Sequence, residues 1–429
     1  MEQSTTALAK DFRRWQIRIL VSTWLAYAGY YFCRKAFYTV KGAMGDELGL
    51  SAMDLAHLGT AYLVGYAIGQ FSSAFFGRKL GPKVLLLVGM GVSIGCNLAF
   101  GIQNGFWTML VFMALNGMAQ GTGWPGCIGS LGYWFKREQR GSILGVWSTC
   151  YQVGSVVATA FAAFMLGTWG WRWSFMGAST LLLMVWALVL FMHPNTPEHV
   201  GHRSVREDDE DESEPAAQAS PGKREPLGWS RDVVITVLTM GAIYFCIKFL
   251  RYALWSWTPY FLSNSYGMEE DQAGYLSTVF DMAGFAGVLM AGWLSDKWLK
   301  GRRSLLSLMM LIGMTGSFVL MYLFGAQSIP IFAVTMGLCG FMLYGPDSLL
   351  SGVGAIDVGS VRGALVAAGL INGMGSIGPI FQEQLVGWMY EASGGDIQPI
   401  LTLFVFVAAA GTGIMLYLHL RARAGKSQL

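Results

Sequence analysis

The sequence predicts an all-α polytopic membrane protein with twelve transmembrane helices. Of its 429 residues, 54% are hydrophobic and only 13% are charged, which is more apolar than a soluble domain of this length. Apolar segments of about 20 residues, long enough to cross a hydrocarbon core of roughly 30 Å, recur along nearly the whole chain, and the alternation typical of β-barrel strands is absent. The expected helices are 17–40, 55–76, 83–103, 106–131, 141–166, 172–193, 232–262, 272–296, 304–325, 328–353, 363–390 and 396–420.

Between the sixth and seventh helices the composition changes abruptly. Residues 194–231 are charged, rich in Pro and Ala and nearly free of large apolar side chains, which is typical of a flexible linker. The acidic run from Glu207 to Glu214 has two interpretations, a solvated tether or a partner-binding segment, and the tether is favoured. We therefore expect a six-helix bundle over 1–193, a flexible acidic linker over 194–231 and a second six-helix bundle over 232–429.

The short loops place their cations on one side of the membrane, which predicts the orientation because cytoplasmic loops are enriched in Lys and Arg. The opposite connections GIQNGF and GAQSIP carry no charge, and the turn before the eighth helix offers only the acids Glu269, Glu270 and Asp271. We expect a multi-pass protein of the cell (inner) membrane with both termini and the linker in the cytoplasm. The cations are Lys10, Arg13, Arg14, Arg18, Arg78, Lys79, Lys83, Lys136, Arg137, Arg140, Lys297, Lys300, Arg302, Arg303, Arg421, Arg423 and Lys426.

Several classes of function are disfavoured. The net charge of +3 follows from the topological bias, and no basic face is concentrated for nucleic acid. The six cysteines fall in expected helices without paired metal-ligand spacing, so they are expected to be small core residues. No P-loop, metal-ligand cluster or Ser/His/Asp arrangement is recognisable. The sequence predicts neither an enzyme nor a metal or cofactor site.

Two arginines lie inside strongly apolar stretches. Arg34 is in WLAYAGYYFCRKAFYTV and Arg251 is in AIYFCIKFLRYALWSWTPYF. An ionisable group at membrane depth costs several kcal/mol at least, so each arginine should face a polar cavity or a partner. The guanidinium is a planar fork of donors that binds phosphate oxygens bidentately. We expect an anion-binding site.

Helical spacing surrounds both arginines with further candidates. Tyr27 and Tyr31 share a face with Arg34, although a tyrosine stripe is also typical of packing at a water interface. Lys248 lies on the same helix face as Arg251, one turn earlier, and two such cations suit a dianion. The alternative for Lys248 is snorkelling or neutralisation of a buried acid.

Two basic turns echo each other between the halves, GRKLGPK at 77–83 and GWLSDKWLKGRRS at 292–304. Two related halves are typical of transporters. The second copy resembles the loop signature of the major facilitator superfamily, in which the acid pairs with the turn's cations and latches one conformation. Asp296 is thus a gating candidate, and the alternative is that the cations only enforce topology.

A closer resemblance covers nearly the whole chain. GYYFCRK at 29–35 and FLRYALWSWTPYFL at 249–262 are similar to the first and seventh helices of organophosphate:phosphate antiporters. That family includes glycerol-3-phosphate and hexose-phosphate exchangers, a hexose-phosphate sensor and animal sugar-phosphate carriers. The resemblance implies the major facilitator fold of two pseudo-symmetric bundles, with Arg34 and Arg251 binding phosphate. It also implies that Lys35 pairs with acids of the second half, including Asp281.

Other positions depart from the glycerol-3-phosphate exchanger. Gln70 stands where that family member has a lysine, Tyr151 where it has a histidine, and Ser256 where it has a second acid. The changes at Gln70 and Tyr151 weaken pure phosphate attraction and are compatible with a sugar-like polyol end, whereas Ser256 makes the network of salt bridges thinner. Polar side chains such as Tyr66 can bond substrate hydroxyls, although hydrogen bonds between helices are the favoured use for any one of them.

The predicted function is therefore antiport by alternating access. A monomer in the lipid bilayer would exchange an organic phosphate, such as glucose-6-phosphate or glycerol-3-phosphate, for inorganic phosphate. One alternative is a non-transporting membrane sensor of external hexose phosphate with a sensor-kinase partner. A multidrug exporter is less favoured, because a cation substrate calls for intramembrane carboxylates rather than paired arginines.

Overall fold

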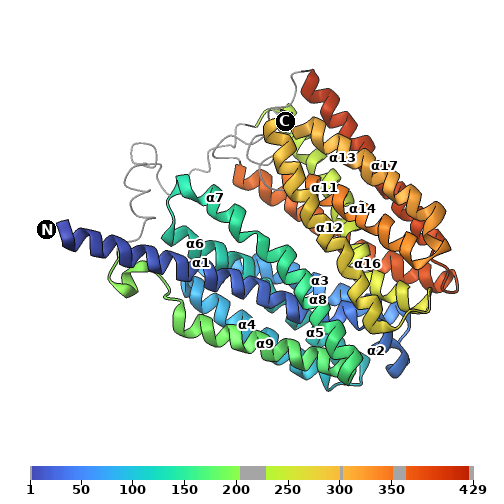
Figure 1. Ribbon diagram of the computed structural model, residues 1–429, viewed down its shortest axis with the longest axis horizontal. Coiled ribbons are helices and arrows are strands. Elements are labelled where there is room, and N and C mark those ends of the chain that lie inside the picture. Colours follow the sequence, from blue (N-terminus) through green and yellow to red (C-terminus); the bar gives the residue numbers. More distant parts are fainter. Residues whose placement is uncertain (1, 203–228, 300–302, 351–363, 425–429) are drawn as a thin grey trace. The chain divides into compact units, whose positions relative to one another are not determined.

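In the computed structural model, which describes residues 2–202, 229–299, 303–350 and 364–424, every regular element is a helix (Figure 1). Eight of the helices in these ranges are long and apolar enough to cross a membrane by length and composition. The exposed side chains along them include large apolar residues such as Trp173, Phe191 and Phe406, as expected of surfaces that face lipid. The predicted all-α membrane fold class is confirmed.

The helices of the first part of the chain follow the expected spans, except that the first begins at Glu2 instead of residue 17, a short helix forms over Lys41–Leu48 and two helices are interrupted. The fourth expected helix is divided at Gly121 and Thr122, and the fifth at Ser148. The hydroxyls of Ser148 and Thr149 donate to the carbonyls of Gly145 and Val146 at 2.9 and 2.7 Å, a type of bond that bends helices. The elements are α1 (Glu2–Thr39), α2 (Lys41–Leu48), α3 (Ala52–Leu80), α4 (Pro82–Gly101), α5 (Phe106–Gln120), α6 (Gly123–Trp134), α7 (Arg137–Trp147), α8 (Thr149–Trp169), α9 (Trp171–Met192) and the 3-10 helix η1 (Pro197–Val200).

The helices of the second part agree with the expected spans within a few residues at most of their ends. They are α11 (Arg231–Asn264), α12 (Glu270–Lys297), α13 (Arg303–Phe324), the 3-10 helix η2 (Gly325–Gln327), α14 (Ile329–Ser348), α16 (Ala364–Ala392) and α17 (Gln398–Arg423). Capping explains where α11 begins, because the Ser230 side chain accepts a bond from the Val233 amide at 3.3 Å. Asp232 in the first turn of α11 also complements the helix dipole.

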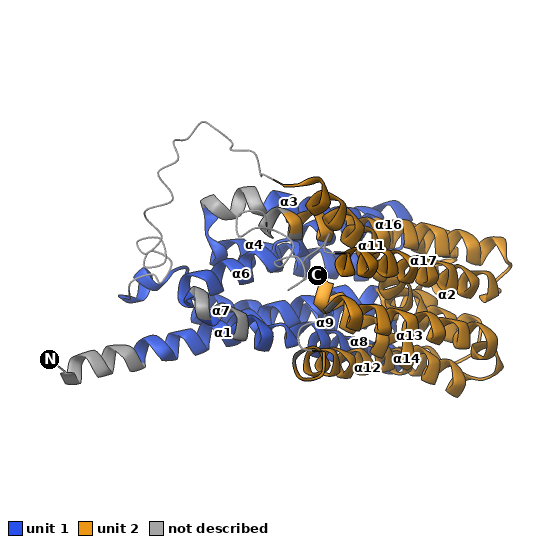
Figure 2. Ribbon diagram, turned by 90° about the horizontal axis from the view of Figure 1, so that it is seen from above, with its two compact units in different colours: residues 1–37, 61–224 blue, residues 38–60, 225–429 orange. Residues whose placement is uncertain are grey.

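The chain forms two compact units (Figure 2). Unit 1 comprises Met1–Phe37 and Ala61–Arg224, and unit 2 comprises Tyr38–Thr60 and Glu225–Leu429. The boundary therefore passes through α1 and α3, whose end and beginning pack with the second unit. The expected acidic linker over 194–231 stays a prediction, because residues 203–228 lie outside the described part of the chain.

Glycine allows close backbone contact between helices in both units. In unit 1, a Cβ atom at Gly117 of α5 would collide with the carbonyl oxygen of Tyr62 on α3. In unit 2, a Cβ atom at Gly340 of α14 would collide with the carbonyl oxygen of Phe280 on α12. Small residues at such crossings let helix backbones approach, and van der Waals packing then holds the helices together in lipid.

A fully buried ion pair joins residues 38–60 to the rest of unit 2. Lys41 Nζ of α2 lies 3.0 Å from Glu383 Oε2 of α16, and both side chains are 0% exposed. Lys41 also donates to Ser256 Oγ of α11 at 2.8 Å, and the Ser256 hydroxyl donates to the other carboxylate oxygen of Glu383. The ammonium lies 4.0 Å from the Trp257 ring centroid. The charges are thus paired and hydrogen-bonded, as burial requires.

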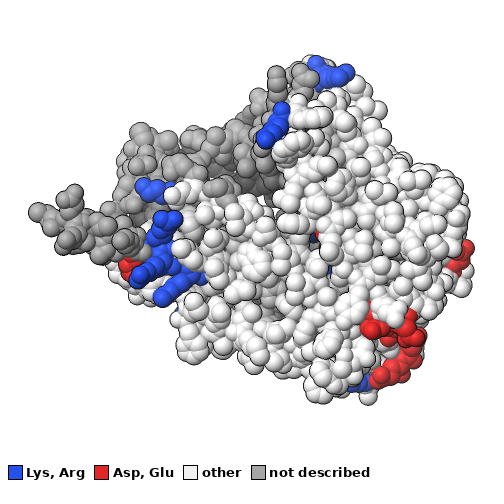
Figure 3. All heavy atoms as spheres, viewed as in Figure 1, with Lys and Arg blue, Asp and Glu red and all other residues white. Residues whose placement is uncertain are grey.

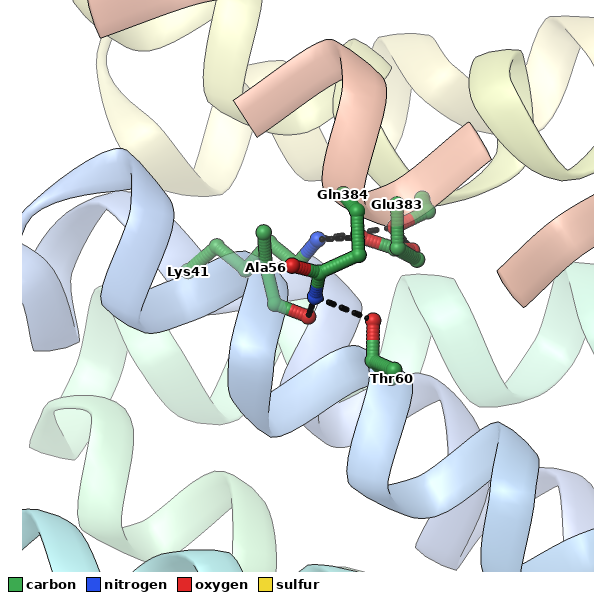
Figure 4. Close-up of polar contacts among 6 residues, drawn as sticks. Lys41, Ala56, Thr60, Glu383 and Gln384 are labelled. Carbon is green, nitrogen blue, oxygen red and sulfur yellow. Dashed lines mark hydrogen bonds and ion pairs between the residues drawn. The ribbon is translucent and has the colours of Figure 1, made fainter. Parts of the chain in front are cut away.

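Gln384, which follows Glu383 on α16, makes a second polar contact with residues 38–60. The Gln384 amide donates to Thr60 Oγ1 at 2.6 Å and to the Ala56 carbonyl at 3.3 Å, both near the start of α3 (Figure 4). Gly59 lies against the Glu383 carboxylate, 3.1 Å from where a Cβ atom would be. Adjacent residues of α16 therefore hold both α2 and the start of α3.

Some of the charged side chains of unit 2 lie at helix ends. α12 begins with Glu270 and Asp271 and ends with Lys297, and the last turn of α17 contains Arg421 and Arg423. On the face shown in Figure 3, acidic side chains form a patch where α12 begins, and most of the remaining described surface is uncharged. Acids at a helix start and bases at a helix end also complement the helix dipole.

Substitution of Gly117 by Ala should lower the free energy of unfolding by about 1–3 kcal/mol, because the new methyl group overpacks against the α3 backbone. Denaturant or thermal unfolding in detergent measures this. Gly95→Ala on α4 is the matched control, since no atom lies within 4 Å of its Cβ position. Equal stability of the two variants would contradict the close contact.

Replacing Lys41 by Met should destabilise the protein by about 3–5 kcal/mol, because Glu383 would remain as a buried charge without a cation. Replacing both Lys41 and Glu383 by Met should recover most of the loss, since two apolar side chains then fill the site. The comparison needs unfolding curves of both single variants and the double variant. Additive losses would show that the two side chains do not act as a pair.

Candidate substrate-binding site

Arg34 is the centre of a polar cluster inside unit 1. It lies near the end of α1 and only 6% of it is exposed. Its Nε donates to Gln120 Oε1 of α5 at 3.1 Å, and the Tyr62 hydroxyl of α3 donates to the same oxygen at 2.8 Å. Three helices therefore position the guanidinium, as expected for a cation at membrane depth that faces polar groups.

Two tyrosines cover the Arg34 guanidinium. Its Cζ atom lies 4.9 Å from the ring centroid of Tyr31 and 5.0 Å from that of Tyr66, which is within cation–π range. Arg34 Nη2 is buried and has no hydrogen-bond acceptor in the described part of the chain. These partners are neutral, so they leave the positive charge and one donor group for an anion.

Gln120 is in turn oriented by a small network. Its amide nitrogen lies 3.3 Å from Asn116 Oδ1 and 3.4 Å from Ser93 Oγ, and the Ser93 hydroxyl donates to Asn116 at 2.7 Å. These bonds use the amide donors, so the Gln120 oxygen faces Arg34. Asn116 thus bridges α4 and α5, which is the structural alternative considered for such residues.

The other predicted substrate-binding residues of unit 1 are Tyr27, Tyr151 and Gln70. The rings of Tyr27 and Tyr151 pack edge to face with their centroids 5.0 Å apart. The ring centroids of Tyr27 and Tyr31 lie 6.1 Å apart. They join the Arg34 cluster through Tyr31. Gln70 lies one turn after Tyr66 on α3 and is half-buried, and the described residues include no hydrogen-bond partner for its side chain.

Arg251 is the centre of the corresponding cluster in unit 2. Its Nη1 lies 2.8 Å from Asp347 Oδ2 of α14, with the two side chains 21% and 10% exposed. The guanidinium Cζ lies 4.5 Å from the ring centroid of Tyr344, whose hydroxyl donates to Asp281 of α12. Unlike Arg34, Arg251 therefore has a carboxylate partner.

Lys248 lies beside Arg251 but bonds to a different helix. Its ammonium donates to Asn372 Oδ1 at 2.7 Å and to Ser376 Oγ at 3.2 Å, both on α16. The ammonium also lies 4.8 Å from the ring centroid of Tyr244. These partners are neutral, so unit 2 offers two cations on one face of α11, of which Arg251 is paired with Asp347.

The three predicted gating residues are Lys35, Asp281 and Asp296. Lys35 is buried in unit 1, and Asp281 is buried in unit 2, where it accepts the Tyr344 bond. Their pairing stays a prediction, because they belong to different units. Asp296 lies in α12, but its side chain is outside the described residues. Ser256, which stands in place of the family's second acid, bonds instead to Glu383.

Sequence reasoning missed Asp347, Glu383 and Lys41. The signal that identified the arginines was present for both acids, since each lies in an apolar stretch, FMLYGPDSLL and IFQEQLVGW. Lys41 was missed because the first helix was expected to end at residue 40. The role of Tyr344 had no such signal, because only the fold places its ring on Arg251.

Comparisons with known proteins agree with this architecture. The family model of the Major Facilitator Superfamily matches residues 23–382. A probable hexose phosphate transport protein of Chlamydia pneumoniae is 25% identical, covering 90% of this chain and 87% of that one. The membrane sensor protein UhpC of Escherichia coli is 27% identical over 88% and 85% of the chains. Sugar phosphate exchanger 3 of Gallus gallus is 29% identical over 79% and 74%.

A solved structure has the same fold. The crystal structure of a bacterial homologue of the human lysosomal transporter Spinster superposes with a TM-score of 0.70, covering 96% of this chain and 98% of that one at 14% identity. The predicted resemblance to the organophosphate:phosphate antiporters is confirmed by the curated relatives. Because the family model matches well over half of the sequence, the chain belongs to the Major Facilitator Superfamily and is an integral membrane transporter rather than an enzyme.

Proposed function

We propose that this transporter exchanges an organic phosphate for inorganic phosphate, with Arg34 and Arg251 as the phosphate-binding residues. The observation that carries the proposal is the Arg34 cluster, in which a buried guanidinium has neutral partners and an unsatisfied Nη2 group. A phosphate oxygen supplies both the missing acceptor and the missing charge. Arginine suits this role because its fork binds phosphate bidentately.

The organic part of the substrate is best matched by a sugar or polyol. Tyr31 and Tyr66 beside Arg34, and Asn372 and Ser376 beside Lys248, offer hydroxyl and amide groups that hydrogen-bond hydroxyls. Relatives named as a hexose phosphate transport protein and a sugar phosphate exchanger support this class. Glucose-6-phosphate and glycerol-3-phosphate are the first candidates, and direct contacts of Tyr27, Tyr151 and Gln70 with substrate belong to the same proposal.

Exchange, rather than one-way flux, follows from the cost of burying charge. A carrier that closes around arginines without an anion leaves cations in a low-dielectric space, which is strongly unfavourable. Bound phosphate removes that cost, so the loaded carrier changes conformation more readily than the empty one. The transporter would act as a monomer, and the gradient of internal phosphate would drive uptake of the organic phosphate.

The proposed location is the cell (inner) membrane, with both termini and the central linker in the cytoplasm. The support is the distribution of charge in the short connections. Arg421 and Arg423 end α17, whereas the acidic residues Glu269, Glu270 and Asp271 surround the start of α12. The Lys35–Asp281 pair and the Asp296 latch are the proposed gating elements.

A membrane sensor of hexose phosphate is the second candidate, and the similarity to the sensor protein UhpC favours it. A sensor would use the same arginines to bind its ligand but would transport it weakly or not at all. It would also bind a sensor kinase on its cytoplasmic surface. A multidrug exporter has less support, because the acid beside Arg251 is already paired with that arginine.

Arg34→Lys and Arg251→Ala should each weaken phosphate binding at least thirtyfold, equivalent to about 2 kcal/mol, because each removes a bidentate donor from a desolvated site. Binding of labelled inorganic phosphate to purified protein checks this. Arg172→Lys is the matched control, since Arg172 donates to carbonyl groups of residues 101 and 103 outside the two clusters. Wild-type affinity in Arg251→Ala that is correctly folded would overturn the assignment of that residue.

Liposomes that contain purified protein and unlabelled internal phosphate should take up labelled phosphate rapidly. Liposomes with the same protein but without internal phosphate should not. External glucose-6-phosphate or glycerol-3-phosphate should compete, and the better competitor identifies the substrate class. Uptake without internal phosphate would contradict obligatory exchange. Binding of sugar phosphate without any exchange would instead establish the sensor.

A further inference from the structure

The two arginine clusters differ in charge. Arg34 is bonded to the neutral Gln120 and lies between two neutral tyrosine rings. Arg251 bonds Asp347 at 2.8 Å and lies on the ring of Tyr344. The Arg251 guanidinium therefore already carries an anionic partner from its own unit, at the position where a substrate phosphate is proposed to bind.

We propose that Asp347 is a specificity-determining residue that competes with the substrate phosphate for Arg251. This inference rests on the proposed function. In the unloaded transporter the Asp347 carboxylate occupies the guanidinium, and the phosphoryl group of the substrate displaces it. Only a ligand that binds Arg251 more strongly than a carboxylate does is then retained, so the site selects phosphate dianions against carboxylate monoanions.

Competition follows from the electrostatics of the Arg251 cluster. The Asp347 carboxylate and the substrate phosphate would both bind the Arg251 guanidinium, and Tyr344 already covers one face of it. A carboxylate and a phosphate that share one guanidinium are like charges a few ångströms apart. At a protein-like dielectric their repulsion lowers the affinity of the site for phosphate by at least about tenfold. A dianion with three acceptor oxygens forms stronger charge-assisted bonds to the fork than a carboxylate does.

The backbone around Asp347 is suited to releasing the carboxylate. Asp347 follows Pro346, which lies inside α14 and has no amide hydrogen to donate. Leu349 and Leu350, which follow the end of α14 at Ser348, have π-helical geometry, and such interruptions occur frequently at functional sites. Within α14 itself, Pro346 interrupts the regular hydrogen-bond ladder one residue before the acid.

A second cation is available to balance the displaced carboxylate. The Lys248 ammonium is attracted to the Asp347 carboxylate and repelled by the Arg251 guanidinium. Its hydrogen bonds go to Asn372 and Ser376, which are neutral. Lys248 can therefore stabilise the acid without losing an ionic partner of its own, and the charge of the loaded site remains distributed over both cations.

Asp347→Asn tests the competition, because it removes the charge and keeps the shape. At pH 7.5 the variant should bind labelled inorganic phosphate at least tenfold more tightly than the wild type, equivalent to about 1.4 kcal/mol. Glycerate, a carboxylate with a polyol end, should compete with phosphate in the variant and not in the wild type. Asp347→Glu restores the charge and should restore wild-type selectivity.

Asp232→Asn is the matched control, because Asp232 pairs with Arg421 at 2.6 Å at the start of α11, away from the Arg251 cluster. It should leave phosphate affinity and glycerate exclusion unchanged. If Asp347→Asn does not fold, Asp347→Ser provides the same two measurements. Unchanged or weaker phosphate binding in a folded Asp347 variant would overturn the inference, and weaker binding would show that Asp347 positions Arg251 for the substrate.

The failure of this inference is distinguishable from the failure of the proposed function. A wild-type protein that binds neither inorganic phosphate nor sugar phosphate would refute both. A wild type that binds phosphate, loses binding in Arg251→Ala and is unaffected by Asp347→Asn would refute only the competition. Asp347→Asn in the Arg251→Ala background should change nothing, because the contested guanidinium is gone.

Discussion

The constraint that shapes this protein is the cost of placing a charge in a membrane-spanning helix. The described residues meet that cost in three ways. Lys41 and Glu383 neutralise each other in complete burial. Arg251 pairs with Asp347 but remains partly exposed. Arg34 has only neutral hydrogen-bond and ring partners. The first solution is structural, the second balances a cation with an acid of its own unit, and the third leaves a cation without an anionic partner among the described residues.

Close helix packing brings these charges to defined positions. Glycines allow α5 to touch α3 in unit 1 and α14 to touch α12 in unit 2, so the same device recurs in both halves of the chain. In unit 1 the contact at Gly117 holds Tyr62 beside Gln120, which orients Arg34. In unit 2 the α12 and α14 contact brings Asp281 to Tyr344, whose ring lies against Arg251. Packing in lipid thus determines which polar groups meet.

The unequal charge of the two clusters bears on how transport is coupled. A site with uncompensated arginines closes poorly when it is empty, which favours exchange. The internal carboxylate Asp347 reduces that penalty in unit 2. Under the proposed competition, the affinity for phosphate would reflect a difference between two ionic interactions rather than the strength of one.

The sequence by itself determined the membrane fold class and most of the helices, because apolar length and the position of cations are local properties. It also identified Arg34 and Arg251, since a charge in an apolar stretch is visible without a structure. Asp347 is also a charged residue in an apolar stretch, and the sequence-based prediction did not include it. Tertiary structure alone decided the partners: that Arg251 meets Asp347 and Arg34 meets Gln120 depends on helices distant in the chain. Such contacts are set by packing between helices, which hydropathy does not encode.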